Sequence, residues 1–208
     1  MGSQSALISL EGILLVCYKK GDLERYITEE KEVDNSVKTT WILSAISTVY
    51  HLHHVSRVLV YGIALRNFLL TDDLSTLKMI DFGQASIFPP NTDITTASND
   101  GTTTQVDIFH LGCVIYSISW QSYHNDLAHH DWVPPPVEDL PKLDGLGPWG
   151  EIIKKCWCCQ YRSSKELHDE TLALFHHRHR IACSQEVDKA GFIINLLSQR
   201  WFDVTFSL

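Results

Sequence analysis

The stretch Tyr61-Gly62-Ile63-Ala64-Leu65-Arg66-Asn67-Phe68-Leu69-Leu70, with Asp81-Phe82-Gly83 following ten residues later, is the most informative part of this chain of 208 residues. Phe68-Leu69-Leu70 and Leu77-Lys78-Met79-Ile80 are short apolar runs on either side of a polar stretch, residues 71–76. This pattern predicts a β-hairpin with a longer loop.

Asn67 and Asp81 lie at the two ends of this predicted hairpin, one before the first strand and one after the second. Antiparallel strands bring these positions side by side. One carboxylate and one carboxamide oxygen suit Mg²⁺, which usually takes only one or two protein ligands. The alternative is that Asp81-Phe82-Gly83 is only a turn, because Asp and Gly favour turns.

Together these residues resemble the catalytic core of a protein kinase, with a catalytic loop like that of fungal or tyrosine kinases. Family members read His-x-Asp-Leu-x-x-x-x-Asn in this loop and Asp-Phe-Gly at the magnesium site. Asn67 and Asp81-Phe82-Gly83 stand in place, whereas Val60 occupies the His position and Gly62 the position of the catalytic Asp. The resemblance implies ATP and Mg²⁺ as cofactors, with Asn67 and Asp81 as metal ligands and Phe82 and Gly83 as structural residues.

Gly62 is the main departure from the family pattern. The family's Asp accepts the substrate hydroxyl proton and orients that oxygen, and a glycine has no side chain for either task. General-base assistance is worth roughly 10²–10⁴-fold in rate. Asp72 and Asp73 do not replace it, because they lie at the far end of the hairpin.

Arg66 is a candidate phosphate-binding residue. The run Ala64-Leu65-Arg66-Asn67 is similar to the Ala-Ala-Arg-Asn of tyrosine-kinase loops, in which the Arg assists near the transferred phosphate. The alternative is a solvated surface arginine.

Upstream, residues 12–23 resemble the last strand of a kinase small lobe, the hinge and the start of the first large-lobe helix. The resemblance implies that backbone groups of Val16 and Tyr18 contact adenine. A buried strand followed by an Asp-capped helix explains the same residues. About twenty residues precede this hinge, and they offer no candidate for the Gly-rich loop, the strand Lys or its Glu partner.

Two amphipathic or apolar runs predict long helices. One carries its apolar residues at helical spacing between Trp41 and Leu52, and His51, His53 and His54 close it. The other, residues 108–118, is apolar on nearly every side and predicts a fully buried helix. The resemblance implies that Asp107 accepts backbone hydrogen bonds from the catalytic loop, and Thr104 with Asp107 also reads as a capping box.

The segment between Gly83 and Asp107 corresponds to an activation loop and is rich in Thr and Ser. The family arginine that receives an activating phosphate is replaced by Tyr61. We therefore expect a loose loop without a phosphorylation switch.

Cysteine and histidine residues invite a metal-binding hypothesis, but their spacing fits no standard zinc pattern. The candidates are Cys156, Cys158, Cys159, His168, His176, His177 and His179. Idle or buried thiols are the alternative, and six cysteines without a secretory signal favour a reducing, cytoplasmic compartment. A net charge of -8 disfavours nucleic acid and anionic membranes as partners.

The sequence thus predicts a mainly α fold with a small β-hairpin (α+β), similar to a protein-kinase large lobe with little or no small lobe. We expect a residual strand and hinge in residues 1–20, the lobe in 21–167 and an unassigned extension in 168–208. The expected function is that of a catalytically impaired, pseudokinase-like protein that acts by binding or scaffolding, with a protein and a nucleotide as candidate partners. The alternative is a weakly active ATP- and Mg²⁺-dependent protein kinase.

Overall fold

A computed structural model describes residues 7–9, 12–14, 16–29, 32–120 and 136–185, and side chains over 16–29, 32–120, 136 and 138–175. The chain divides into two compact units, Tyr18–Ala173 and, separately, Met1–Cys17 with Leu174–Leu208. The second unit contains one described hairpin, in which β1 (Leu7–Ser9) pairs antiparallel with β2 (Gly12–Leu14). The candidate site lies in the first unit.

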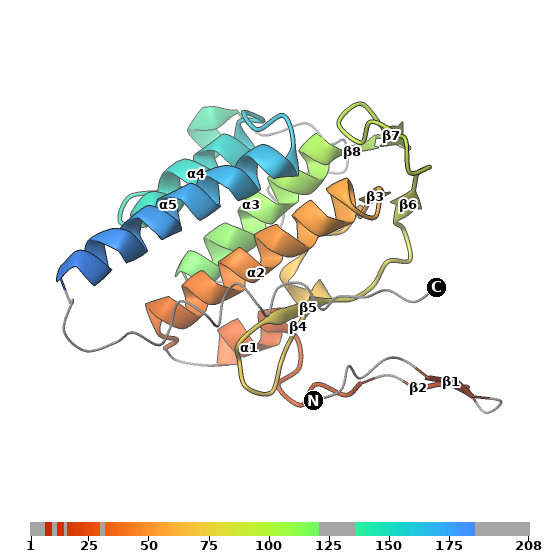
Figure 1. Cartoon of the computed structure of the whole chain (residues 1–208), viewed down its shortest axis with the longest axis horizontal. Helices are drawn as coiled ribbons and strands as arrows, with labels where there is room; N and C mark the ends of the chain where they lie inside the picture. The colour runs from red at the N-terminus through yellow and green to blue at the C-terminus, as the bar shows by residue number, and fades with distance from the viewer. Residues whose placement is uncertain (1–6, 10–11, 15, 30–31, 121–135, 186–208) are drawn as a thin grey trace. The chain divides into compact units, whose positions relative to one another are not determined.

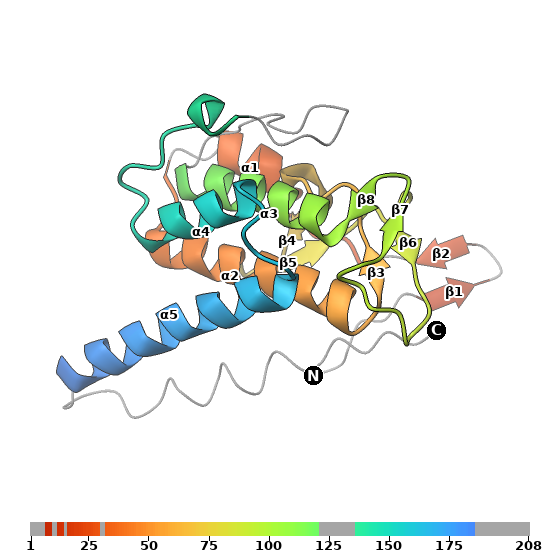
Figure 2. The ribbon, with the colours of Figure 1, turned by 90° about the horizontal axis from the view of Figure 1, so that it is seen from above.

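Helices make up most of the first unit. They are α1 (Leu23–Glu29), α2 (Asn35–His54), α3 (Thr104–Trp120), α4 (Pro148–Trp157) and α5 (Ser164–Gln185), the last of which runs on into the second unit. Figures 1 and 2 show α3 between α2 and α4, and both neighbours pack closely on it.

The strands of this unit are short and form antiparallel pairs. β3 (Val58–Leu59) pairs with β6 (Ser86–Ile87), β4 (Phe68–Leu70) with β5 (Leu77–Met79), and β7 (Ser98–Asn99) with β8 (Thr102–Thr103). The prediction of a mainly α fold with a small hairpin over residues 68–79 is confirmed.

Helix α2 begins where the Asp34 side chain accepts a hydrogen bond from the Ser36 amide at 2.7 Å. Its predicted apolar face is confirmed, since these residues are at most 5% exposed: Trp41, Ile42, Ala45, Ile46, Val49 and Leu52. Burying each of the isoleucine, valine and leucine side chains contributes about 1.5–3 kcal/mol.

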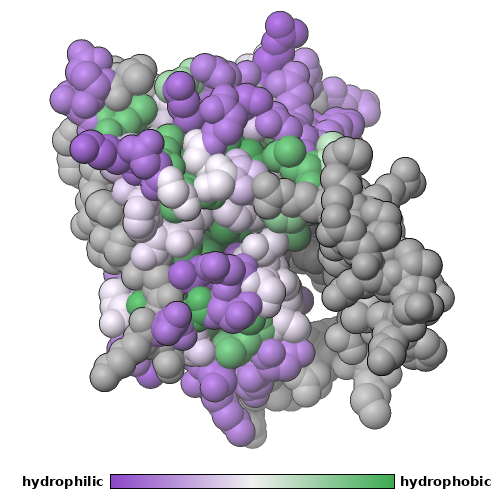
Figure 3. Space-filling view, turned by 90° about the vertical axis from the view of Figure 1, so that its left-hand side faces the viewer, coloured by the Kyte–Doolittle hydropathy of each residue, from purple (hydrophilic) through white to green (hydrophobic). Residues whose placement is uncertain are grey.

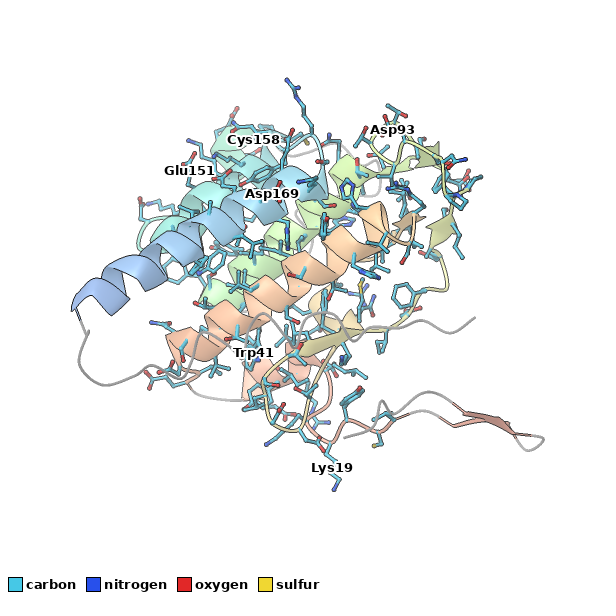
Figure 4. All side chains as sticks on the ribbon, in the orientation of Figure 1. Lys19, Trp41, Asp93, Glu151, Cys158 and Asp169 are labelled. Carbon is cyan, nitrogen blue, oxygen red and sulfur yellow. The ribbon has the colours of Figure 1, made fainter. Side chains whose placement is uncertain are left out.

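Helix α2 also holds the β4–β5 hairpin in place. Trp41 donates its indole N–H to the carbonyl of Leu74 at 2.9 Å, and Ser44 Oγ lies 2.9 Å from Thr76 Oγ1. The Leu77 amide donates to Ser44 Oγ at 3.1 Å. These bonds anchor the far end of the hairpin and thereby fix the direction of its open end (Figure 4).

Helix α3 is buried on nearly every side, as its apolar sequence predicts. It approaches α4 closely at Gly112, where a side-chain Cβ would lie 2.7 Å from Cys156 Cβ and 3.1 Å from Trp157 Cδ1. Glycine at this position therefore permits the contact between the two helices.

Helices α4 and α5 are joined by a polar cluster. Lys155 Nζ donates to both carboxylate oxygens of Glu170, at 2.9 and 3.1 Å, and Tyr161 donates its hydroxyl to Glu170 Oε2 at 3.1 Å. On the face drawn in Figure 3, hydrophobic residues lie in small patches separated by hydrophilic ones. Within the described residues, no helix combines the length and apolar character needed to cross a membrane.

We predict that Gly112→Ala destabilises the protein by about 1–3 kcal/mol, because Cys156 Cβ lies close to the backbone and cannot swing aside. Gly→Ala in an uncrowded helix normally gains up to about 1 kcal/mol. Urea unfolding monitored by circular dichroism measures the difference. Unchanged or increased stability would show that α3 and α4 are not packed this closely.

Candidate functional site: the open end of the β4–β5 hairpin

Asn67 and Asp81 are neighbours in the hairpin register. Phe68 pairs with Met79, and the Ile80 amide donates to the carbonyl of Asn67 at 2.9 Å, one position farther out. Asp81 follows directly. The backbone therefore brings the two predicted metal-ligating positions to the same end of the hairpin.

The Asn67 side chain is only 8% exposed and binds the loop before it. Its Nδ2 donates to the carbonyl of Gly62 at 2.8 Å. Gly62 has φ +141°, a backbone region that L-residues with a side chain rarely adopt. Asn67 thus fixes the loop at the position where the family pattern has its catalytic Asp.

Asp81 is exposed and has φ +63°. The Gly83 amide lies 3.4 Å from Asp81 Oδ1, a long hydrogen bond of the kind that Asp forms in turns. The turn described as an alternative therefore exists, and it leaves the carboxylate facing solvent. The hairpin register places this residue next to Asn67, and one carboxylate with one carboxamide oxygen is a donor set that suits Mg²⁺, which keeps several water ligands.

Two further residues at this end are accessible. Arg66 belongs to the short 3₁₀ helix Leu65–Asn67 and is exposed, and Phe82 is 41% exposed. The loop and hairpin thus present a cation, a carboxylate and an aromatic ring to solvent within seventeen residues of chain, counted from 66 to 82.

Asp107, on α3, binds the loop of residues 60–62. This wholly buried carboxylate accepts hydrogen bonds from the amides of Val60 (Oδ2, 2.8 Å) and Tyr61 (Oδ1, 3.1 Å). The contact is the one that the resemblance implies. The capping box is wrong, because Asp107 faces the loop and Thr104 Oγ1 is buried without a hydrogen bond.

His53 completes this network and was not identified from the sequence. Its Nε2 lies 2.9 Å from Asp107 Oδ2 and its Nδ1 lies 3.0 Å from Ser164 Oγ, and all three side chains are buried. An imidazole protonated at Nε2 satisfies both contacts, because it donates to the carboxylate and accepts from the hydroxyl. His53 therefore connects α2, α3 and α5.

Ser164, His53 and Asp107 contact one another in the same succession as the residues of a hydrolase catalytic triad. The geometry nevertheless excludes a catalytic role. Ser164, His53 and Asp107 are each 0% exposed, so no substrate reaches the hydroxyl. The ring is also reversed, because in a triad the nitrogen facing Ser is Nε2 and the one facing Asp is Nδ1. The network is structural.

The predicted hinge residues fall in different units. Val16 belongs to the unit with Met1–Cys17, and Tyr18 begins the other unit. The Tyr18 carbonyl accepts a hydrogen bond from the Gly21 amide at 3.1 Å, and the Lys19 amide donates to Asp72 Oδ1 at 3.0 Å. Tyr18 thus enters a turn beside the hairpin loop.

The prediction of a loose segment between Gly83 and Asp107 is wrong. Ile94 is 1% exposed, and Arg57 Nε donates to the Pro90 carbonyl at 3.2 Å. The Phe88 amide donates to the carbonyl of Arg57 at 2.9 Å. The burial of Ile94 and the hydrogen bonds with Arg57 order this segment, and neither requires a phosphate.

The Cys/His metal hypothesis gains no support among the described residues, which contain no group of three or more His, Cys, Asp or Glu side chains able to hold a metal. Burial raises the pKa of the Cys156 thiol well above its ordinary value. Such a thiol is a poor metal ligand at neutral pH. The side chains of His176, His177 and His179 lie outside the described residues.

The chain matches no known family model and no curated protein.

We predict that Asp107→Ala destabilises the protein by about 3–5 kcal/mol, because the His53 ring and the amides of Val60 and Tyr61 lose their shared acceptor. The matched control is Glu29→Ala, which removes an exposed ion pair with Arg25 and should cost about 0.5 kcal/mol or less. Urea unfolding compares them. Equal effects of the two substitutions would contradict the role of Asp107.

Proposed function

We propose that the chain is a member of the protein kinase family that does not transfer phosphoryl groups and acts by binding. The observation that carries this proposal is the loop of residues 60–62. Asp107 and Asn67 hold this loop by three hydrogen bonds, while its third residue is a glycine with φ +141°. In this proposal the loop keeps the backbone contacts of a phosphoryl-transfer site, through Asp107 and Asn67. It lacks the side chain at position 62 that would accept the substrate proton.

The backbone at Gly62 strengthens the case against catalysis beyond the missing side chain. A Cβ at this position would lie 3.8 Å from Asn67 Nδ2, an ordinary contact, so space is available. The φ angle is the obstacle, since a side chain at such a backbone angle is strained. The loop therefore has a conformation adapted to glycine.

A bound ATP with Mg²⁺ would meet residues suited to hold it. Asn67 and Asp81 would supply oxygen ligands to the metal, Arg66 would lie toward the phosphates, and the backbone at Tyr18, in the same unit, would contact the adenine. ATP would supply the phosphoryl group. This chain's residues would bind and orient the nucleotide, but none of them stands at position 62 to accept a proton.

The second candidate is a weakly active protein kinase. It is favoured by the exposure of both Arg66 and Asp81 at the open end of the hairpin, where a nucleotide could reach them. Positioning and electrostatics supply most of the catalysis in phosphoryl transfer, so slow transfer without a base is chemically allowed.

A transfer assay with labelled ATP, Mg²⁺ and protein substrates separates the two candidates. We expect no incorporation above that of an Asp81→Ala variant run in parallel. Incorporation by the natural chain that disappears in Asp81→Ala would overturn the noncatalytic proposal and establish the weak kinase.

We further predict that Gly62→Asp does not restore transfer. The substitution should destabilise the protein by about 1–3 kcal/mol, because a residue with a side chain is strained at the φ angle of this position. Gly62→Ala is the matched control and should lose a similar amount, since it adds the same Cβ without a carboxylate. Transfer appearing in the Asp variant alone would show that only the base had been lost.

A further inference from the structure

A stack of three aromatic rings joins α2 to α5. The Tyr50 ring stacks on His168 with centroids 4.4 Å apart and planes at 12°. It also stacks on His54, four residues farther along α2, at 5.3 Å and 29°. Two imidazoles and one phenol thus lie in contact between the two helices.

Each imidazole has one nitrogen that is buried and unsatisfied. His54 Nε2 and His168 Nδ1 have no hydrogen-bond partner. The Asp169 carboxylate lies 3.7 Å from His168 Nδ1, too far for a hydrogen bond. A neutral imidazole tolerates an unpaired acceptor nitrogen, whereas an imidazolium needs a partner for both N–H groups.

The surroundings of both rings disfavour their charged forms. Burial lowers the pKa of His54 most, and electrostatic interactions with His53, Arg57 and Lys165 lower it further, while Asp169 opposes them. Burial also lowers the pKa of His168, against an opposing effect of Asp169 and with a further lowering by Lys165.

The charged groups facing the stack come from three segments. Arg57 follows α2, and Lys165 and Asp169 lie on α5. Asp93, in the segment between β6 and β7, interacts electrostatically with His54; Figure 4 labels Asp93 and Asp169. Both carboxylates are already engaged, because Asp169 accepts from Lys165 and Asp93 accepts from the amide and hydroxyl of Thr95. The Tyr50 ring attracts an imidazolium by a cation–π contact. This attraction opposes the loss of hydration that burial imposes on each charged imidazole.

We propose that the His54–Tyr50–His168 stack is a pH-sensitive contact that releases the start of α5 from α2 on mild acidification. Both rings hold a proton less readily when stacked than when α5 is released. The stacked arrangement is therefore at full strength above the ordinary imidazole pKa of 6.5, and it weakens as the pH falls from 6.5 toward the lowered pKa values of the stacked rings.

Release at this point affects the buried network as well. The start of α5 carries Ser164, whose hydroxyl contacts His53 Nδ1, and Leu167, which is 0% exposed. Acidification would thus expose Leu167. It would also loosen the contact between Ser164 and His53, the residue that contacts Asp107. The proposal itself does not require that the hairpin site binds a nucleotide.

Two measurements on the natural chain test the proposal. Proton NMR titration should give pKa values below 6.5 for His54 and His168. Amide hydrogen exchange, corrected for intrinsic rates, should show residues 164–172 opening several-fold more at pH 5.5 than at pH 7.5, with α3 unchanged. Titration of both rings at or above 6.5, or unchanged exchange, would overturn it.

Variants test the same point through stability. His54→Phe with His168→Phe keeps stacking rings and removes both titrating groups, so the fall in urea midpoint between pH 7.5 and 5.5 should be at least halved. His51→Phe, a substitution on α2 outside the stack, should retain the full fall. An undiminished fall in the double variant would contradict the proposal, and the single His168→Phe variant serves if the double variant does not fold.

Discussion

The buried carboxylate of Asp107 is the constraint on which the rest of this structure depends. It lies inside α3 and accepts hydrogen bonds from a histidine of α2 and from two amides of the loop before the hairpin. A buried charge is tolerated only when it is paired and hydrogen-bonded, so these three donors are required together. Through His53 the same network reaches Ser164 at the start of α5.

This network explains how the loop of residues 60–62 keeps a defined shape although its side chains are not those of a catalytic loop. The backbone supplies the donors to Asp107, so the contact does not depend on which side chains stand at positions 60 and 61. Asn67 then binds the carbonyl of Gly62 from the other side. Backbone contacts and one asparagine therefore suffice to give the loop its shape.

The sequence predicted the elements whose apolar spacing is regular, namely α2, α3 and the β4–β5 hairpin. It also predicted the contact of Asp107 with the loop, through the family resemblance. It did not identify His53, because a histidine near a helix end looks like a favourable charge at the helix dipole, and only the fold shows that it faces Asp107. The segment after Gly83 looked loose because of its Thr and Ser content, whereas burial of Ile94 and the contacts of Arg57 depend on residues far away in sequence.

Amide hydrogen exchange at Val60 and Tyr61 tests the central claim most directly, because these two N–H groups donate to Asp107. The account predicts that both amides exchange as slowly as those of the core of α3, since they open only when the buried network breaks. Exchange at the rate of the exposed hairpin loop around Asp72 and Asp73 would show that Asp107 does not hold the loop.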